Sequence, residues 1–352
     1  MRFLHPEPAA GHPTVHPVFI PFAGCPVRCV FCSQEAQSGT SHMCDNVLAA
    51  KALAEIAQLA PAGKSPVELA FYGGTFTALP LELMETFLSA ASRLKEQALI
   101  SAVRCSTRPD ALSMELLLKL KALGLDTIEL GVQSFCAEPL AASQRGYAPE
   151  TAVQACHMVR EAGLTLGIQL MPGMPGMRKE HFLYDQERCA AIRPDFARLY
   201  PCLVLEGTAL AELWRKKLFT PWPLEMVLEL LPEALLNLWR AGVKIIRMGL
   251  APQKGLPERI LDGPAHPALG QILRSRALFG FIAEKVRASG YGEASLALYA
   301  PKRFQGEFFG HRRELAENYA GIRLDPEDVH WWDKNCFELV PIQGFLPRKS
   351  RK

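Results

Sequence analysis

Three cysteines fall within eight residues in the run Ile20-Pro-Phe-Ala-Gly-Cys-Pro-Val-Arg-Cys-Val-Phe-Cys32. They are Cys25, Cys29 and Cys32, and a short apolar run with the composition of a β-strand comes just before them. Structural zinc sites and ordinary electron-transfer clusters usually take four protein ligands, so a compact set of three leaves one metal position open. We therefore expect a metal-binding loop after a first strand, with room on the metal for a ligand.

Strand-like and helix-like stretches alternate along the chain from this run onward. The predicted strands cover residues 17–22, 67–72, 102–106, 127–132, 165–171 and 197–203. The predicted helices cover residues 46–59, 81–97, 113–123, 149–162, 179–191 and 224–239. Such alternation predicts a parallel sheet, because each right-handed crossover returns the chain beside the preceding strand. The pattern fits an α/β fold, either a partial or closed βα barrel or a doubly wound sheet.

Distinctive residues follow five consecutive predicted strands. They are the cysteine run, Gly73-Gly-Thr75, Thr107-Arg-Pro-Asp110, Gln133-Ser134 and Pro172-Gly-Met-Pro-Gly176. In βα barrels the functional groups gather at the C-terminal ends of the strands. We therefore predict a partial TIM-type (β/α)6 barrel.

The alternation changes in the last third of the chain. A seventh strand is predicted over 244–250 and a long helix over 269–288, followed by weaker strand candidates at 295–299, 304–309 and 337–340. We predict an N-terminal extension over 1–15, a barrel over 16–243 and a small α+β C-terminal extension over 244–352.

Composition points to a globular enzyme. The chain has 352 residues, of which 49% are hydrophobic and 21% charged, and it can bury a large core. No apolar stretch reaches the roughly 18 residues of a membrane span, and the N-terminus lacks a signal-peptide core, so we expect a cytoplasmic location with no membrane contact. The seven other cysteines are then expected to be reduced and mostly buried. A formal charge of +3 does not by itself indicate nucleic-acid binding.

The cysteine spacing resembles the Cys-x3-Cys-x2-Cys signature of radical S-adenosylmethionine (SAM) enzymes, with Phe31 at the aromatic position before the third cysteine. The resemblance implies a 4Fe-4S cluster on Cys25, Cys29 and Cys32, whose open iron is chelated by the amino and carboxylate groups of SAM. It also implies an external one-electron reductant. The reduced cluster would cleave SAM to methionine and a 5'-deoxyadenosyl radical, which abstracts hydrogen from a substrate.

Seven residues are predicted to contact SAM: Gly73, Gly74, Thr75, Gln133, Ser134, Arg145 and Gln169. The resemblance implies that backbone carbonyls of the glycine run accept bonds from the amino group. Gln133 and Ser134 are candidates for the ribose or the carboxylate, and Arg145 for the carboxylate. Gln169 is expected to project into the barrel, where Gly167 would leave room for adenine.

A closer resemblance extends over about residues 16–290. The runs at 71–77, 106–110, 129–134, 169–176 and 199–208 are similar to the radical domain of the Elongator catalytic subunit and its bacterial relatives. In Elongator that domain serves modification of wobble uridine in transfer RNA, beside an acetyltransferase domain. This sequence leaves no room for such a domain and lacks a long basic N-terminal extension. We therefore expect radical chemistry without acetyl transfer, with RNA, in particular tRNA, as a candidate partner.

Two other functions are compatible with parts of the sequence. Ile20-Pro-Phe22 is similar to coproporphyrinogen oxidase-like dehydrogenases, although Ala23 and Gly24 intervene before the first cysteine and Phe31 replaces the tyrosine of that group. The other alternative is a non-catalytic iron-sulfur or zinc protein, in which Cys44 or His42 would complete a zinc site.

Overall fold

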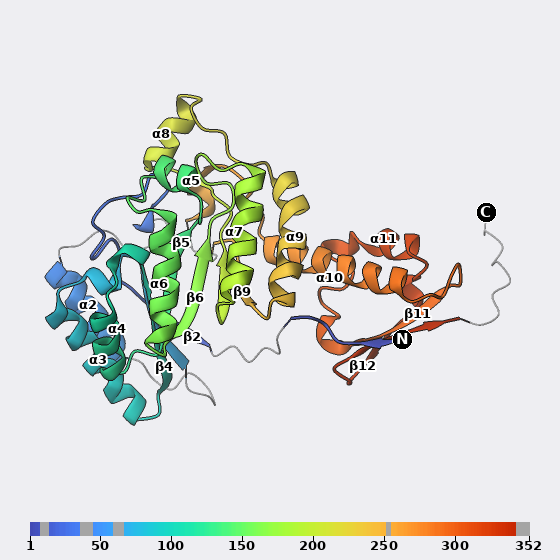
Figure 1. The fold of residues 1–352 in the computed structure, drawn as a ribbon, viewed down its shortest axis with the longest axis horizontal. Coiled ribbons are helices and arrows are strands. Elements are labelled where there is room, and N and C mark those ends of the chain that lie inside the picture. The colour runs from blue at the N-terminus through green and yellow to red at the C-terminus, as the bar shows by residue number, and fades with distance from the viewer. Residues whose placement is uncertain (8–13, 36–44, 59–66, 251–254, 343–352) are drawn as a thin grey trace. The chain divides into compact units, whose positions relative to one another are not determined.

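A parallel sheet of seven strands is the central element of the larger of two compact units (Figure 1). In the computed structural model, residues 1–7, 14–35, 45–58, 67–250 and 255–342 are described. The chain divides into two compact units. The barrel unit comprises Ala9–Val227 and Ala241–Ala265, and the C-terminal unit comprises Met1–Pro8, Leu228–Arg240 and His266–Lys352.

The strands of the barrel unit follow one another in the sheet in the order in which they occur in the chain. They are β2 (Val15–Phe19), β3 (Val67–Tyr72), β4 (Ile100–Thr107), β5 (Thr127–Gln133), β6 (Thr165–Leu170), β7 (Phe196–Leu199) and β9 (Lys244–Met248). Every neighbouring pair is parallel, so all the C-terminal strand ends lie on one edge. The sheet curls into a half barrel, which confirms the predicted partial TIM-type fold.

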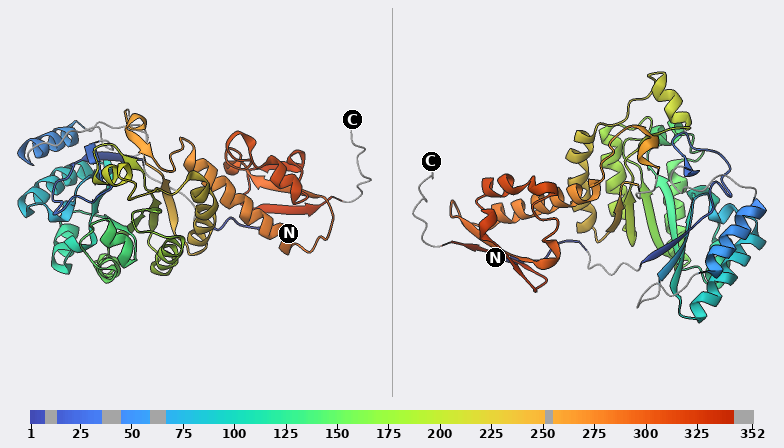
Figure 2. Two further views of the ribbon diagram at one scale, coloured as in Figure 1. Left: turned by 90° about the horizontal axis from the view of Figure 1, so that it is seen from above. Right: turned by 180° about the vertical axis from the view of Figure 1, so that it is seen from behind.

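Helices connect the strands of the barrel unit. They are α2 (Asp45–Ala57), α3 (Leu81–Glu96), α4 (Met114–Ala122), α5 (Ala137–Ala142), α6 (Pro149–Glu161), α7 (Lys179–Ile192), α8 (Ala209–Arg215) and α9 (Leu224–Arg240), most of which belongs to the C-terminal unit. Figure 2 shows helices on the outer face of the curled sheet. Short 3-10 turns follow β3 at η1 (Phe76–Ala78) and β4 at η2 (Pro109–Ala111). Within the described residues, no helix combines the length and apolarity that a membrane crossing requires.

Most predicted elements lie within three residues of the observed ones, with two informative differences. The first strand ends at Phe19, because Phe22 adopts a left-handed φ of 59° that turns the chain toward the cysteines. The strand expected at 304–309 is wrong: a 3-10 turn, η4 (Lys302–Phe304), ends where the strand was expected to begin, and Phe308 N donates to Phe304 O at 2.9 Å. Phe304 and Phe308 are both buried at a spacing of four, which suits a helical turn and not a strand.

The C-terminal unit contains a four-stranded sheet that combines a strand from residues 2–3 with strands from residues 296–341. Its order is β1 (Arg2–Phe3), β13 (Phe337–Pro341), β11 (Leu296–Pro301) and β12 (Val329–Trp332). The unit also contains helices α10 (Leu269–Ala288) and α11 (Ala316–Gly321). The β1 strand pairs antiparallel with β13, so residues predicted as an N-terminal extension supply an edge strand. The predicted domain limits stay a prediction.

His5 lies in the aromatic core of the C-terminal unit. Its ring centroid is 4.8 Å from those of Trp239 and Phe304 and 5.4 Å from that of Phe281. Burial lowers the pKa of His5 to about 3, and the nearby Arg274 and Arg303 guanidiniums add to the shift. The imidazole is therefore neutral in the folded unit at ordinary pH.

We expect acid to destabilise the C-terminal unit through His5. The folded pKa of about 3 lies below the ordinary value of 6.5, so between these values the unfolded chain binds more protons. Stability should fall on acidification through this window, by up to about 1.4 kcal/mol per pH unit. Hydrogen exchange of the α10 amides at several pH values would measure it. The change His5→Phe should flatten the dependence, and an equal slope in both proteins would contradict this origin.

Candidate active site

The loop that carries the three cysteines is locked against the glycine run that follows β3. Thr75 N donates to Ala23 O at 2.8 Å, and Cys25 Sγ lies 3.4 Å from Thr75 Oγ1. A Cβ on Gly74 would stand only 2.3 Å from Ala23 O, and one on Gly24 would stand 2.3 Å from Thr75 O. Both glycines have a positive φ, so only glycine permits this approach of the two backbones.

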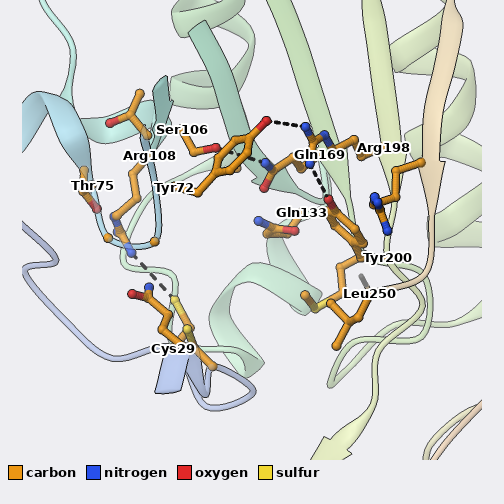
Figure 3. Close-up of a pocket in the computed structure, with 18 of the residues that line it drawn as sticks. Cys29, Tyr72, Thr75, Ser106, Arg108, Gln133, Gln169, Arg198, Tyr200 and Leu250 are labelled. Atoms are coloured by element: carbon orange, nitrogen blue, oxygen red, sulfur yellow. Dashed lines mark hydrogen bonds between the residues drawn. The ribbon is translucent and has the colours of Figure 1, made fainter. Parts of the chain in front are cut away.

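Two guanidinium groups face the cysteine loop. The buried Arg145 places Nη1 3.1 Å from Cys29 Sγ. Arg108 places Nη1 3.9 Å from the same sulfur, as Figure 3 shows. Arg108 is oriented by Asp110, which accepts bonds of 2.9 and 2.7 Å from it. Arg145 is held by Tyr147 Oη, which accepts from Nε at 3.2 Å and from Nη2 at 2.9 Å. Both guanidiniums therefore bring positive charge to the sulfur of Cys29.

The thiol of Cys32 lies in a protected part of the loop. Burial raises its pKa to about 12, and the neighbouring Cys29 and Cys25 contribute to the increase. Three thiols in one loop, with two guanidiniums beside Cys29, have the composition of a metal-binding loop.

A cavity of about 870 Å³ opens beside this loop, within the size range of small-molecule and cofactor sites. Its lining includes the three cysteines and six of the seven residues predicted to contact SAM, namely Gly73, Gly74, Thr75, Gln133, Arg145 and Gln169. Inward-facing residues of the curled sheet line the rest. Figure 3 shows how side chains from the cysteine loop and from several strands meet around this space.

Gln133 presents an unsatisfied acceptor to the cavity. This residue ends β5 with a left-handed φ of 66°, and its side-chain Oε1 is buried without a hydrogen-bond partner. A buried acceptor without a partner is costly, and a positive φ in a residue other than glycine adds strain. Both observations suit a position where a bound ligand donates a hydrogen bond.

Ser134 differs from the other predicted residues. It is fully buried, it is not among the residues that line the cavity, and its Oγ accepts from Cys136 N at 3.0 Å. The loop here is held by Asp185 of α7, whose Oδ1 accepts from Phe135 N at 2.6 Å. Burial raises the pKa of Asp185 to about 7. The structure therefore places Ser134 on the α7 side of its strand.

A buried charge network forms the wall of the cavity along five neighbouring strands, and the sequence analysis missed it. Its centre is Glu129 of β5, which is fully buried. The Oε1 atom accepts from Arg104 Nη1 of β4 at 2.8 Å and from Arg198 Nη2 of β7 at 2.9 Å. Tyr72 of β3 donates to the same oxygen at 2.8 Å, and Gln169 of β6 donates to Oε2 at 3.0 Å. Arg104 also pairs with Glu68 through a Nε bond of 3.0 Å.

The sequence contains one indication of this network, namely charged residues inside strands that are otherwise mainly apolar. Glu68, Arg104, Glu129 and Arg198 each interrupt a strand that is otherwise mainly apolar. Because a charge buried in a sheet needs a partner, such residues indicate ion pairs between strands. The sequence does not say which residues pair.

The space expected beside Gly167 is occupied. A Cβ at this glycine would lie 2.3 Å from the Phe196 ring, so the missing side chain makes room for that ring and not for adenine. The Phe196 ring in turn lies 4.5 Å beneath the Arg104 guanidinium carbon. Gly167 therefore allows the Phe196 ring to pack against β6, in place of the expected space for adenine.

Positive charge predominates around the cavity. The described lining contains seven cationic residues, Arg28, Arg104, Arg108, Arg145, Arg198, Lys244 and Arg247, and two carboxylates, Glu68 and Asp195. Part of this charge is used within the protein, because Arg104 and Arg198 pair with Glu129 and Arg108 pairs with Asp110. The remaining excess favours an anionic ligand.

The described residues contain no group of three or more histidine, cysteine or acidic side chains arranged to hold a single metal ion. Cys44 and His42, which the zinc alternative requires, lie outside the described residues, so that alternative stays a prediction. A four-iron cluster takes each cysteine on a different iron, so its ligands need not converge on one point. Of the seven cysteines outside the loop, six lie in the described residues, and four of these, Cys105, Cys156, Cys189 and Cys202, are buried.

Comparison with known proteins shows two family matches. Residues 19–188 match the radical SAM superfamily, and residues 194–277 match the Radical_SAM C-terminal domain. The chain is 31% identical over 244 residues to a tRNA uridine(34) acetyltransferase of Methanocaldococcus jannaschii, covering 62% of this chain and 44% of that protein. It is 33% identical over 170 residues to Elongator complex protein 3 of Danio rerio, covering 42% and 31%. The chain thus spans less than half the length of these relatives.

Two solved structures are similar to this one. The archaeal Elp3 of Methanocaldococcus infernus, lacking its N-terminus, gives a TM-score of 0.58 at 26% identity and covers 78% of this chain and 64% of that one. Coproporphyrinogen III oxidase of Escherichia coli gives a TM-score of 0.50 at 24% identity, covering 66% and 54%. At this identity the second similarity concerns the fold alone.

Removing the Glu129 carboxylate should destabilise the barrel unit strongly. Glu129→Ala leaves two buried guanidiniums without their shared partner, a loss typically worth about 3–5 kcal/mol. The control is Glu85→Ala, which removes a surface ion pair with Lys119 and should cost less than about 1 kcal/mol. Urea unfolding of the full chain measures both. Equal effects of the two changes would show that the network adds no stability.

Proposed function

Because the chain belongs to the radical SAM superfamily, we propose that Cys25, Cys29 and Cys32 hold a 4Fe-4S cluster and that the adjacent cavity binds SAM. The observation that carries this proposal is the position of the three cysteines on one edge of a cavity, with the Arg145 guanidinium 3.1 Å from Cys29 Sγ. When bound, the cluster and SAM supply reductive cleavage of a carbon–sulfur bond and a 5'-deoxyadenosyl radical that takes a hydrogen atom from substrate. The electron comes from an external one-electron donor.

The residues present fit these two cofactors. The thiols occupy one loop, positive side chains stand beside it, and Gln133 Oε1 is a buried acceptor without a partner. Because Gly74 has no side chain, its backbone lies in close contact with Ala23 beside the cysteines. Each feature offers a type of contact that the cluster or SAM needs.

Several residues of the chain would then have defined tasks. Gly73 and Gly74 would present backbone carbonyls to the SAM amino group, and Thr75 would support Cys25 through their contact of 3.4 Å. Gln133 would accept a hydrogen bond from the bound nucleoside. Gln169 is held by Glu129, so it would offer its remaining amide atoms in a fixed orientation.

The guanidinium nitrogens of Arg145 already donate hydrogen bonds within the protein. Nη1 approaches Cys29 Sγ, and the other nitrogens bind Tyr147 Oη and the carbonyl of Gly131. We assign it first to charge stabilisation of the cysteine loop. A further bond to the SAM carboxylate would require it to share these donors.

We propose RNA, and tRNA in particular, as the substrate class. The relatives named as tRNA uridine(34) acetyltransferases support this assignment, and the excess of cationic residues at the cavity suits a phosphate-bearing substrate. The proposal covers only the radical step, because the matched families are those of the radical superfamily.

Reconstitution with iron and sulfide under anaerobic conditions tests the radical step. The expected result is a brown protein that forms 5'-deoxyadenosine from SAM when a reductant is added. Cys29→Ala should lower this product at least about 100-fold, because loss of one ligand disrupts the cluster. The matched control is Cys336→Ala, a partly exposed cysteine of the C-terminal unit that should retain activity. A colourless protein containing only zinc would exclude the radical function.

Binding of tRNA tests the substrate class separately. The full chain should shift tRNA in a gel at moderate salt, and affinity should fall steeply as salt rises from about 50 to about 200 mM, since phosphate contacts release counterions. Absence of binding at low salt would remove RNA from the proposal and leave the SAM chemistry standing. Anaerobic oxidation of a porphyrinogen would instead favour the coproporphyrinogen oxidase alternative.

A further inference from the structure

One face of the four-stranded sheet in the C-terminal unit carries a set of exposed aromatic and basic side chains. Figure 1 shows helices α10 and α11 on the opposite face. Along β11, Leu296, Leu298 and Ala300 are fully buried, whereas Tyr299 is 37% exposed. This alternation assigns Tyr299 to the face away from the core.

Tyr299, His330 and Trp332 form an aromatic cluster on that face. Tyr299 is paired in register with His330 of β12, and Trp332 follows two residues later on the same side of the strand. The Tyr299 ring centroid lies 5.0 Å from that of His330 and 5.3 Å from that of Trp332. We call these three residues the aromatic face.

The indole of Trp332 is held along one edge. Trp332 Nε1 donates to Cys336 O at 2.7 Å, at the turn before β13. Lys334 Nζ lies over the Trp332 ring, 4.5 Å from its centroid. A base that stacks on Trp332 would take the place of Lys334 on the ring, and the displaced ammonium would then lie close to a phosphate.

Basic side chains gather at one end of the aromatic face. The strands β11 and β12 are parallel, and the residues that follow them include the exposed Lys302, Arg303 and Lys334. One acidic residue, Asp333, lies among them and pairs with Lys302 at 3.0 Å. The acidic Asp325, Glu327 and Asp328 precede β12, at its other end. Glu338 of β13 is in register with Tyr299, and this carboxylate pairs with Arg2 at 2.9 Å. Lys302, Arg303 and Lys334 lie at the end of the face beside Trp332.

We propose that the aromatic face binds single-stranded RNA, with bases stacked on Tyr299, His330 and Trp332 and phosphates beside Lys302, Arg303 and Lys334. Same-face residues two apart on a strand are spaced by about 7 Å, which suits unstacked bases lying on successive rings. Aromatic side chains on a sheet with adjacent cations are a general means of holding single strands. This inference rests on RNA as the substrate class of the proposed function, and it adds a second contact region outside the barrel unit.

Fluorescence anisotropy with a labelled oligouridine of about 12 nucleotides tests the proposal on the full chain. Tyr299→Ala and Trp332→Ala should each weaken binding by about 5- to 100-fold, since each removes one stacking partner. Tyr299→Phe keeps the ring and should retain affinity. Tyr184→Ala, which removes a 46% exposed tyrosine of α7 in the barrel unit, is the matched control and should have little effect.

A charge variant tests the same surface without removing an aromatic ring, in case the aromatic variants misfold. Lys334→Gln changes an exposed side chain and should weaken binding while reducing the magnitude of the salt slope by about 1. A duplex of the same length should bind more weakly than the single strand, because its bases are already stacked. Thermal unfolding of each variant verifies that the C-terminal unit is intact.

Three results would overturn the proposal. They are an unchanged Kd in correctly folded Tyr299→Ala and Trp332→Ala, equal affinity for duplex and single strand, or binding of vesicles of anionic phospholipid in place of RNA. Formation of 5'-deoxyadenosine by the unchanged chain is measured in parallel. If it forms while the variants bind RNA normally, this inference fails alone. If the face binds RNA and no 5'-deoxyadenosine forms, the proposed function fails alone.

Discussion

The fully buried carboxylate of Glu129 joins five neighbouring strands of the barrel unit. It accepts hydrogen bonds from Tyr72 of β3, Arg104 of β4, Gln169 of β6 and Arg198 of β7, while it belongs to β5 itself. A buried carboxylate is tolerated only when its charge and lone pairs are satisfied, so this set of partners constrains how the strands can curl. The interior of the half barrel is therefore organised by charge as well as by apolar packing. Burial raises the pKa of Tyr72, and the Glu129 charge adds to this, so the phenol stays a donor.

This network gives the cavity a charged wall. In many βα barrels layers of branched apolar side chains fill the interior. Here the inward positions of the strands hold paired arginine, glutamate and glutamine side chains, and Phe196 fills the space beside Gly167. The side chains that line the cavity are thus oriented before any ligand binds, which lowers the entropic cost of binding.

The cysteine loop depends on a second constraint, the contact of two backbones without side chains between them. Gly24 and Gly74 allow the loop after β2 to lie against the loop after β3, and Thr75 N bonds Ala23 O across the contact. Arg145 then brings positive charge to Cys29 from the segment after α5. Parallel strands place all three segments on one edge of the sheet, so residues from distant parts of the sequence meet at the thiols.

Local patterns in the sequence predicted the βα alternation, because apolar periodicity depends on near neighbours. The cysteine spacing was also visible in the sequence. Six of the residues proposed to contact SAM line one cavity. The sequence did not reveal which charges pair, since Glu129 and Arg198 are 69 positions apart. It also did not reveal that Ser134 lies toward α7, that 304–309 turns, or that Arg2–Phe3 joins the last strand of the chain. The aromatic face likewise exists only once β11 and β12 are in register. These features were decided by the tertiary structure, because each is a contact between residues that only the folded chain brings together.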